Sequence, residues 1–562
     1  MIRISNRICL LALVYVLIVS CSSDEEQAPV ITGVVPAQGY EGDIIEIEGL
    51  NFSAAVSENS VKINGVPAAL TSASANSLSV VVPLNATTGK IELVTRGFTV
   101  TSTEDFVVVS NPTPKITSIT PSNGKTESTI TISGEYFTSD KSAIDVLFTN
   151  AGSAPAEIVS SSPTTIQVKV PLDALSGPVT VKVRGVAALE TPNFDVTPSL
   201  TDLSPKEGRI GNLVTITGSG FTSETTISFS HEQGAAAVVA EIVSSSNRQL
   251  IVAVPPTSGT GKIYLAGAPT TNNFTFKSSW AVKGNFPDGY VLQAALTINS
   301  KLYFGLGYSS PSTYHKDWWE YNPDTNVWTP KADFPGAANS GFITFSIGNK
   351  GYVGLGENNE IWSYDPELDK WTMVSQIPGV TSRLYAASFV IGESVYITSG
   401  KTVGESALAD TWQYTPSTNA WDPKATFPET GGLGYLGMAI NDKGYVGHLG
   451  NPDNAFFYEY NPALNSWSKK RDVPLSPLTA GTQIYNSGTP QYCTSSEGIV
   501  FYDRQFFKYL PQYDKWVTMR ILGGTSNDVS YSLNIECGAI LNGKGYYINR
   551  SGSTSQVVEF TP

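Results

Sequence analysis

Tryptophan recurs through the second half of this chain at a nearly constant interval. The repeating residues are Trp280, Trp328, Trp371, Trp421, Trp467 and Trp516. They are 48, 43, 50, 46 and 49 residues apart, and each of the last five follows a short turn such as NPDTNVW (322–328). A period in the forties, in a segment rich in glycine and β-forming residues, is typical of propellers built from four-stranded blades. Propellers are binding domains more often than enzymes. This repeat therefore favours a binding function before any single residue is considered.

Each repeat also contains an apolar strand such as KGYVGLG (350–356) and an aromatic strand such as WWEYNP (318–323). The chain stops at Thr561-Pro562, where a further turn to Trp would begin. Trp280 and its neighbours can supply the outer strand that the last repeat lacks. We therefore expect six blades over 277–562, with the first and last segments sharing one blade so that no sheet edge stays open.

A different repeat precedes the tryptophans. Its copies are PAQGYEGDIIEIEGLNF (36–52), PSNGKTESTITISGEYF (121–137) and PKEGRIGNLVTITGSGF (205–221). They align without a gap, and their starts are 85 and 84 residues apart. Each begins with Pro and a Gly-bearing turn, alternates apolar and polar residues, and ends Gly-x-x-Phe. Alternation with a period of two predicts half-buried strands of a sandwich.

These modules resemble the IPT/TIG family of immunoglobulin-like domains, over roughly 28–276. The tryptophan repeats resemble kelch repeats of the bacterial kind, although the Gly-Gly pair of kelch is reduced to Gly-x-Gly or lost. The expected fold is all-β, with three tandem immunoglobulin-like (IPT/TIG) sandwiches followed by a six-bladed kelch-like β-propeller. Its expected domains are 28–110, 111–197, 198–276 and 277–562. We expect the sandwiches to form a stalk, with ligand-binding sandwiches as the alternative.

The N-terminus has the features of an export signal. Arg3 and Arg7 precede an apolar run that is too short to span a bilayer comfortably. Ile18-Val19-Ser20-Cys21 resembles a bacterial lipobox, which predicts a signal peptide at 1–20 and a lipid on Cys21; the alternative is an ordinary signal peptide. The acidic tether at 21–27 resembles the surface-export signal of Bacteroidetes lipoproteins. This resemblance implies an outer-membrane protein that is held by its lipid anchor alone and faces the exterior.

Charge bears on the partners. Without Arg3 and Arg7 the chain has 33 basic and 49 acidic residues, a net charge of −16. No run of Lys or Arg is longer than the three residues 469–471. This acidic composition argues against nucleic acid as a partner. The expected partners are a glycan or an outer-membrane protein.

Ligand contacts are expected where the repeats differ, in the loops at one end of the propeller. Trp319, Trp362 and Trp412 occupy one repeat position, so we interpret them as packing between blades rather than as a sugar platform. Tyr with Arg and His suits a neutral glycan, which has apolar faces and hydroxyl edges; solvent-exposed loop tyrosines are the alternative. The candidate ligand-binding residues are Tyr308, Tyr314, His315, Arg383, Tyr385, Tyr435, His448 and Arg504. Arg550 occupies the same kind of loop as Arg504.

No catalytic residue, cofactor or metal site is predicted, because the three histidines do not have metal-ligand spacing. An Arg–carboxylate site of Arg383 with Glu393 or Glu405 is the one enzymatic arrangement left open. Cys493 and Cys537 could form a disulfide across neighbouring blades in an oxidising compartment, or could remain buried thiols.

The sequence thus favours non-catalytic capture of a ligand at the cell surface, with a glycan as the preferred ligand. The architecture resembles the surface glycan-binding proteins of Bacteroidetes nutrient-uptake systems. Two alternatives remain: a protein-interaction subunit of an outer-membrane complex, and a sugar-modifying kelch-type enzyme.

Overall fold

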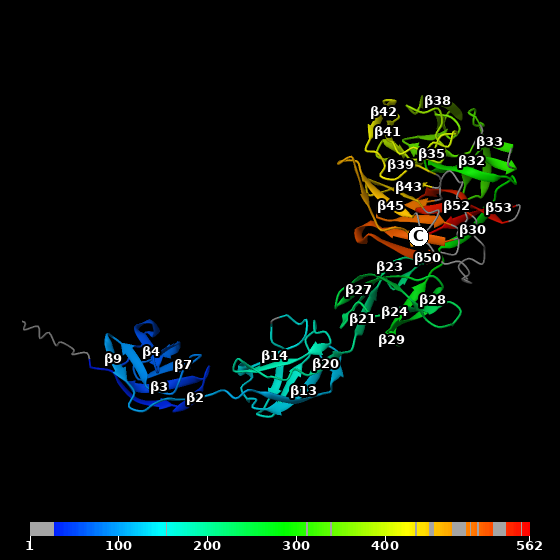
Figure 1. Ribbon diagram of the computed structural model, residues 1–562. Coiled ribbons are helices and arrows are strands. Elements are labelled where there is room, and N and C mark those ends of the chain that lie inside the picture. The colour runs from blue at the N-terminus through cyan, green and yellow to red at the C-terminus, as the bar shows by residue number, and fades with distance from the viewer. Residues whose placement is uncertain are drawn as a thin grey trace, which may run out of the picture. The chain divides into compact units, whose positions relative to one another are not determined.

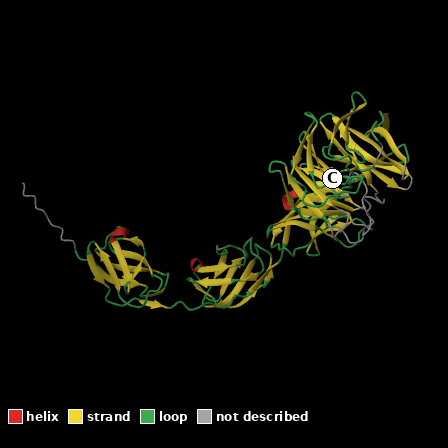
Figure 2. Cartoon of the chain, turned by 45° about the horizontal axis from the view of Figure 1, so that its top comes forward, coloured by secondary structure: helices red, strands yellow, loops and turns green. Residues whose placement is uncertain are grey.

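The computed structural model describes residues 27–152, 154–310, 313–337, 340–432, 435–448, 455–474, 491–494, 496–502, 505–520, 535–551 and 554–562. Strands dominate these residues, and the helical segments among them are short 3-10 turns, namely η1 (Val56–Glu58), η2 (Lys141–Ala143) and η5 (Pro511–Tyr513) (Figure 2). The fold is therefore all-β, as the sequence predicts. No helix in the described part of the chain is long and apolar enough to cross a membrane. The chain divides into two compact units, residues 1–171 with 176–195 and residues 172–175 with 196–562.

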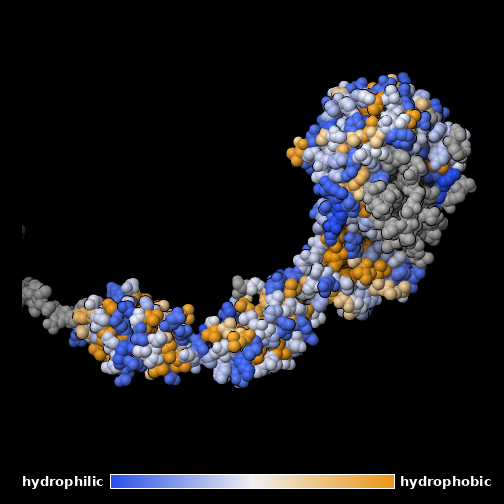
Figure 3. All heavy atoms as spheres, viewed as in Figure 1, coloured by the Kyte–Doolittle hydropathy of each residue, from blue (hydrophilic) through white to orange (hydrophobic). Residues whose placement is uncertain are grey.

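The first unit contains two β-sandwiches. The first sandwich has the sheets β1 (Val30–Val35), β3 (Ile44–Leu50), β7 (Ser77–Val81), β6 (Leu70–Ala73); β5 (Val66–Ala68), β4 (Asn59–Ile63), β8 (Ile91–Thr95), β9 (Phe98–Thr101); and β10 (Val107–Val109), β2 (Gln38–Tyr40). The second has the sheets β11 (Lys115–Thr120), β13 (Thr129–Glu135), β16 (Thr165–Lys169), β15 (Ile158–Ser161); β14 (Ile144–Leu147), β18 (Thr180–Val183), β19 (Val186–Ala187); and β12 (Asn123–Gly124), β20 (Asn193–Val196), β17 (Gly177–Pro178). Surface apolar residues are interspersed with hydrophilic ones on both (Figure 3).

A third sandwich begins the second unit. Its sheets are β21 (Ser199–Ser204), β23 (Leu213–Ser219), β27 (Gln249–Ala253), β26 (Glu241–Ser245); and β22 (Glu207–Gly208), β29 (Ala268–Phe276), β28 (Ser258–Leu265), β24 (Ile227–His231), β25 (Val238–Val239). Apolar residues alternate along β23, and Val214 and Ile216 face Ile227 and Phe229 of the other sheet in one buried cluster. The period-two pattern of the sequence therefore places its apolar side chains between the two sheets.

The Gly-x-x-Phe motif that ends the repeated segment has a steric reason. In the first sandwich a Cβ on Gly49 would stand 2.1 Å from the Val30 carbonyl oxygen and 2.1 Å from the ring of Phe52. Gly134 and Gly218 meet Phe137 and Phe221 in the same way. Because all three rings are buried, the glycine lets an aromatic side chain fold back onto its own strand and seal one end of the core.

Gly49→Ala should destabilise the first sandwich by about 1–3 kcal/mol, because the added methyl group forces the Phe52 ring and the neighbouring strand apart. Thermal unfolding followed by circular dichroism would measure the change. Gly33→Ala is the matched control, since its Cβ would meet its nearest neighbour, the Glu48 carboxylate, at an ordinary 3.6 Å. Equal losses in the two variants would contradict this explanation of the motif.

Six four-stranded antiparallel sheets follow the third sandwich, coloured from green to red in Figure 1. From the first to the fifth they are β31 (Val291–Ile298), β32 (Lys301–Ser310), β33 (Thr313–Asn322), β34 (Val327–Lys331); β35 (Phe342–Ile347), β36 (Lys350–Leu355), β37 (Glu360–Asp365), β38 (Lys370–Gln376); β39 (Ala387–Ile391), β40 (Ser394–Thr398), β41 (Thr411–Thr415), β42 (Ala420–Lys424); β43 (Tyr435–Ile440), β44 (Lys443–His448), β45 (Phe456–Asn461), β46 (Ser466–Lys469); and β47 (Gln491–Cys493), β48 (Gly498–Tyr502), β49 (Gln505–Leu510), β50 (Lys515–Arg520). The sixth contains β51 (Ile535–Leu541), β52 (Lys544–Ser551), β53 (Thr554–Phe560) and, as its fourth strand, β30 (Trp280–Asn285).

The turn before each repeated Trp is fixed by one side chain. In the fourth sheet Asn465 has a left-handed backbone, with φ of 47°, and its Oδ1 accepts a 2.7 Å hydrogen bond from the Tyr460 hydroxyl. The same Tyr-to-Asn or Tyr-to-Asp bond, with the acceptor in the same conformation, forms in the first, second, third and fifth sheets, at Tyr321–Asn326, Tyr364–Asp369, Tyr414–Asn419 and Tyr509–Asp514. Asn and Asp tolerate this conformation better than other non-glycine residues, which explains the repeated turn sequence.

The repeated tryptophans join each sheet to the one before it. The Trp371 indole N–H of the second sheet donates to the Ala332 carbonyl at the end of the first, at 2.9 Å. Equivalent bonds run from the indole N–H of Trp328, Trp467 and Trp516 to the carbonyls of Asn285, Ala425 and Arg471, and from that of Trp421 to the Ser375 hydroxyl. The regular spacing of these five tryptophans along the chain therefore reflects a structural contact that each of the first five sheets makes.

The sixth sheet joins the beginning and the end of this region. Trp280 of β30 pairs with Phe560 of β53, the same register in which Tyr321 pairs with Trp328 and Tyr364 with Trp371. The prediction that Trp280 supplies the missing outer strand is confirmed. The first strands β31, β35, β39, β43, β47 and β51 contact one another in that order, and β51 contacts β31.

The third sandwich packs directly on the fifth sheet. Val243 and Ala253 of the sandwich form a buried cluster with Leu510 and Val517. Ile210 of the sandwich belongs to a second cluster that includes Met519. The Lys515 ammonium donates to the Ile242 carbonyl at 3.0 Å. The third sandwich therefore shares its core with the sheets, which a freely jointed stalk domain would not do.

Candidate functional site

A cavity of about 320 Å³ lies between the first strands of the six sheets. We call it the six-strand cavity, and its volume is at the lower end of the range for small-molecule sites. Its described lining is uncharged. The residues with polar or sulfhydryl groups are Gln293, Thr344, Ser388, Tyr435, Cys493 and Cys537, and the others are apolar residues and glycine.

Two of these side chains, on the separate strands β31 and β43, contain hydrogen-bonding groups. Gln293 of β31 is only 8% exposed, and its amide oxygen has no hydrogen-bond partner among the described residues. Tyr435, the first residue of β43, donates its hydroxyl to the Thr430 carbonyl at 2.6 Å. Burial raises the pKa of Tyr435 to about 12, so the phenol stays neutral at physiological pH.

Both cysteines of the sheets are thiols and do not form the disulfide considered from the sequence. They lie on β47 and β51, and both line the six-strand cavity. Burial raises the pKa of Cys493 to about 12 and that of Cys537 well above its usual range. The alternative of two buried, protonated thiols is therefore the one that the structure supports.

Tyr308, Tyr314 and His315 lie together at the far ends of β32 and β33, where Tyr308 pairs with Tyr314. The His315 ring stacks on Tyr290 with 4.0 Å between centroids, and its Nδ1 is 3.6 Å from the Asp317 carboxylate. The His315 Nε2 is buried without a hydrogen-bond partner in the described chain. These residues form a side group in the first sheet and do not line the six-strand cavity.

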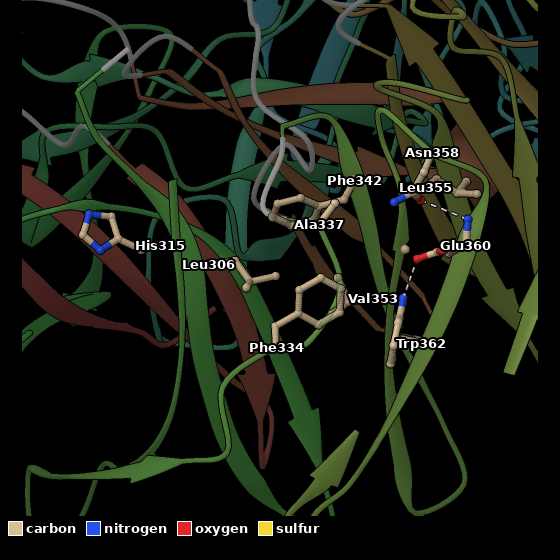
Figure 4. Close-up of a pocket in the computed structure, with 11 residues that line it drawn as sticks. Leu306, His315, Phe334, Ala337, Phe342, Val353, Leu355, Asn358, Glu360 and Trp362 are labelled. Carbon is tan, nitrogen blue, oxygen red and sulfur yellow. Dashed lines mark hydrogen bonds between the residues drawn. The ribbon is translucent and has the colours of Figure 1, made fainter. Parts of the chain in front are cut away.

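His315 also borders a small pocket between the first two sheets (Figure 4). Glu360 lies at its edge, with its carboxylate accepting the Trp362 indole N–H at 2.9 Å and its backbone N–H donating to Asn358 at 3.0 Å. The pocket has a volume of about 10 Å³. That is less than a single water usually requires, so the pocket is a packing gap between sheets.

Arg383 is placed differently from its predicted position in a binding loop. Its side chain is completely buried, and its two Nη2 bonds to the Asp410 carboxylate measure 2.6 and 2.7 Å. It also donates to the Ser399 carbonyl at 3.1 Å. Glu405 instead pairs with Lys401, and Glu393 lies in the exposed turn after β39. The Arg383 pairs with Glu393 or Glu405 that the sequence left open are therefore not formed.

The remaining candidates are Tyr385, His448 and Arg504. Tyr385 is half-buried before β39, and its backbone N–H donates to the Gly341 carbonyl at 2.8 Å. His448, at the end of β44, packs edge-on against Tyr435 with 5.2 Å between ring centroids. Arg504 lies outside the described residues. The structure thus brings His448 against Tyr435, which lines the six-strand cavity, and leaves the predicted residues of the first sheet elsewhere.

The buried carboxylate of Glu536, next to the cavity residue Cys537, was not predicted from the sequence. Glu536 of β51 accepts the Leu292 backbone N–H at 3.0 Å and lies 3.5 Å from Arg550, which also donates to the Gly289 carbonyl. Burial raises the pKa of Glu536 to about 7, although the Leu292 N–H and Arg550 favour the carboxylate. The available signal was an acidic residue inside the apolar strand IECGAIL (535–541). Gln293 gave no such signal, because it follows no repeated motif.

Glu536 should make stability depend on pH. Between its ordinary pKa near 4.5 and its folded pKa of about 7, the folded state binds more protons than the unfolded state. The free energy of unfolding should therefore fall as pH rises through this window, by up to about 3 kcal/mol. Glu536→Gln should flatten that dependence and raise stability above pH 7, since an amide oxygen can still accept the Leu292 N–H. Urea unfolding at a series of pH values tests this, and parallel profiles for the two proteins would contradict it.

Comparisons with known proteins agree with part of this architecture. A family model described as the IPT/TIG domain matches residues 29–108, 114–195 and 198–283, so the chain contains three tandem IPT/TIG domains, as the resemblance predicted. Fibrocystin-L of Homo sapiens is 29% identical over 213 residues, which are 35% of this chain and 5% of that protein. The chain thus spans only a small part of this relative.

Two solved structures are also similar. One is a structural-genomics protein of unknown function from Bacteroides thetaiotaomicron, with 14% identity and a TM-score of 0.35, covering 65% of this chain and 98% of its own. The other is YjhT, with 16% identity and a TM-score of 0.37, covering 50% of this chain and 97% of its own.

Proposed function

We propose that this chain, whose first half consists of three tandem IPT/TIG domains, captures a glycan at the cell surface without chemically altering it. The observation that carries the proposal is the six-strand cavity. Its uncharged lining combines aromatic and aliphatic walls with the side chain of Gln293 and the hydroxyls of Thr344, Ser388 and Tyr435. Apolar faces with a few hydrogen-bonding groups match the surface of a sugar ring.

The proposal includes a six-bladed, kelch-like propeller as the binding domain. Three observations support it: six four-stranded antiparallel sheets, first strands that contact one another from β31 through β51 and back, and the pairing of β30 with β53. In such a propeller the six-strand cavity is part of the central channel, because the first strands of the blades line it.

The proposal also includes an outer-membrane location with a lipid on Cys21. The lipobox-like sequence at 18–21 and the acidic residues that follow it support this location. The first two IPT/TIG domains would then act as a spacer between the anchor and the binding domain. Metabolic labelling with a fatty-acid analogue, compared between the wild-type protein and Cys21→Ala, would test the anchor.

Glycan capture is tested by screening the full-length protein on a glycan array and by affinity electrophoresis in polysaccharide gels. Retardation by one class of polysaccharide, with unchanged glycan chain length after incubation, is the expected result. The absence of binding to neutral and acidic glycans alike would overturn the proposal.

A protein-interaction role is the second candidate, and the three IPT/TIG domains favour it. Immunoglobulin-like sandwiches occur in many cell-surface proteins, where they host unrelated functions. A stable outer-membrane partner recovered by crosslinking on intact cells, in the absence of any glycan binding, would favour this candidate.

A further inference from the structure

We infer that one end of the first IPT/TIG sandwich rests on the lipid surface to which the chain is anchored. This end, which we call the proximal end, presents the exposed side chains of Val30, Leu50, Val56, Arg96 and Phe98. The inference rests on the lipid on Cys21 that the proposed function includes. It goes beyond that function, because it assigns a lipid-contacting surface to a domain proposed only as a spacer.

Both sheets of the sandwich contribute to the proximal end. Val30 begins β1 and pairs with Leu50, the last residue of β3. The loop that follows β3 reaches the other sheet, where the Ser53 N–H donates to the Thr95 hydroxyl at 3.1 Å. Thr95 ends β8 and pairs with Phe98, the first residue of β9, across a tight turn. These segments therefore meet at the end of the sandwich where the chain enters it.

The exposed side chains of the proximal end are mostly apolar, with one cation among them. Val30, Leu50, Val56 and Phe98 are 47, 52, 43 and 36% exposed. Arg96 is exposed in the turn between β8 and β9 and forms no ion pair with a described residue. Glu58, in the loop before β4, accepts a 2.6 Å hydrogen bond from the Ser53 hydroxyl. Apolar side chains can enter the headgroup boundary of a membrane, and a guanidinium can bind lipid phosphate there.

The other two sandwiches are polar at the matching register position. In chain order, the three pairs are Val30 with Leu50, Lys115 with Glu135, and Ser199 with Ser219. The fold therefore does not require apolar residues at this position. The apolar pair occurs in the sandwich that directly follows the anchor.

The turn that contains Arg96 has a docking role in the second sandwich. Arg184 occupies the equivalent turn there, with φ of 50° against 48° for Arg96. Its Nε donates to the Asp43 carboxylate of the first sandwich at 3.2 Å, and its guanidinium carbon lies 4.4 Å from the centre of the Tyr40 ring. Arg96 has no such partner among the described residues. The same turn is therefore available for a partner in the first sandwich.

The length of the tether identifies the lipid surface as that partner. Eight residues, 22–29, separate Cys21 from Val30. Even when fully extended they reach at most about 30 Å, so the proximal end stays close to the lipid headgroups. Because the anchor already holds the sandwich there, a contact too weak to bind a membrane alone forms at high effective concentration.

Fluorescence quenching in proteoliposomes tests the inference. The full-length, lipidated protein is reconstituted in phosphatidylethanolamine and phosphatidylglycerol vesicles that contain a lipid with a nitroxide on its headgroup. A nitrobenzoxadiazole fluorophore on Leu50→Cys should be quenched at least about twofold more strongly than the same fluorophore on Leu84→Cys. Leu84 is the matched control, because it is 69% exposed and lies in the loop after Val82, whose N–H bonds the Asp43 carbonyl at the opposite end.

A second measurement places the fluorophore on Phe98→Cys and changes the neighbouring pair. Val30→Lys with Leu50→Glu installs the Lys–Glu pair that the second sandwich has at this register, so the first sandwich should still fold. Quenching at residue 98 should then fall to the level of the Leu84→Cys control. Circular dichroism of the variant confirms that the sandwich is intact.

The possible outcomes separate the inference from the proposed location. Equal quenching at residues 50 and 84 in the lipidated protein would overturn the inference and leave the anchor intact. Quenching at residue 98 that ignores the double variant would also overturn it, as would crosslinking of residue 50 to a second protein without lipid quenching. A wild-type protein without a lipid on Cys21 would instead overturn the proposed location, and the inference with it.

Discussion

Replacing Asp410 with alanine should destabilise the six-sheet region by about 3 kcal/mol, a large share of the stability of a typical domain. The reason is that the partner, Arg383, has no exposed surface and directs two hydrogen bonds of 2.6 and 2.7 Å at this carboxylate. Without it a guanidinium stays buried with only carbonyl oxygens such as that of Ser399 to offset its charge. Urea unfolding followed by tryptophan fluorescence would measure the loss.

Replacing Arg383 instead of Asp410 should lower the free energy of unfolding much less. The Asp410 side chain is 43% exposed, so water can solvate its charge when Arg383 is replaced. Arg383→Met is therefore the informative control, because it fills a similar space without a charge. We expect Arg383→Met to lose less than half of what Asp410→Ala loses, and the double variant to resemble Arg383→Met. A larger loss from Arg383→Met would show that the pair stabilises the fold chiefly by attraction rather than by matching a buried charge.

The second large effect concerns the third IPT/TIG domain. A chain that starts at residue 277 should aggregate or unfold at a lower temperature than one that starts at residue 198. Removing the sandwich uncovers Leu510, Val517 and Met519, which are at most 3% exposed in the intact chain. Each such side chain contributes roughly 1.5–3 kcal/mol when fully buried. Size-exclusion chromatography and a thermal melt of both proteins would measure the difference.

Val517→Asp in the full-length protein disrupts the contact between the third sandwich and the fifth sheet without shortening the chain. It therefore shows whether the truncation acts through this contact. The substitution places a carboxylate against Val243 and Ala253 and should lower the melting temperature as the truncation does. Val327→Asp, at an exposed residue of β34, is the matched control and should leave the melting temperature nearly unchanged. Equal melting temperatures for the chains that start at 198 and 277 would mean that the third sandwich is an independent domain, as the sequence alone suggested.

Local motifs could be interpreted correctly because their causes are local. The Gly-x-x-Phe segments identified the sandwiches, since Gly49 and Phe52 contact each other within one strand and its following turn. The turn to each Trp identified the sheets, since Tyr460 and Asn465 bond across five residues. Both patterns occur several times in the sequence, and their repetition makes them recognisable without a structure.

The candidate site was less predictable because it is formed by residues that do not repeat. Gln293, Ser388 and Cys537 lie on different first strands and share the six-strand cavity only after the sheets assemble. Tyr435, which lines the cavity, could be proposed as a candidate from the sequence because an aromatic residue in a loop between repeats stands out. Arg383 was assigned to ligand binding for the same kind of reason, yet Asp410, 27 residues later, holds it inside the fold.

The sequence by itself determined the all-β class, the three IPT/TIG domains, the number of repeats after them and the use of Trp280 as the last outer strand. These properties depend on periodicity and on short-range sterics, which a linear pattern records. Only the tertiary structure decided that the third sandwich shares a core with the fifth sheet, that Arg383 is buried, and that Cys493 and Cys537 remain thiols around one cavity. Those outcomes depend on contacts between residues that are far apart in the sequence, from 27 residues for Arg383 and Asp410 to 273 for Ile242 and Lys515. Burial at such contacts sets the charge state and the accessibility of each group.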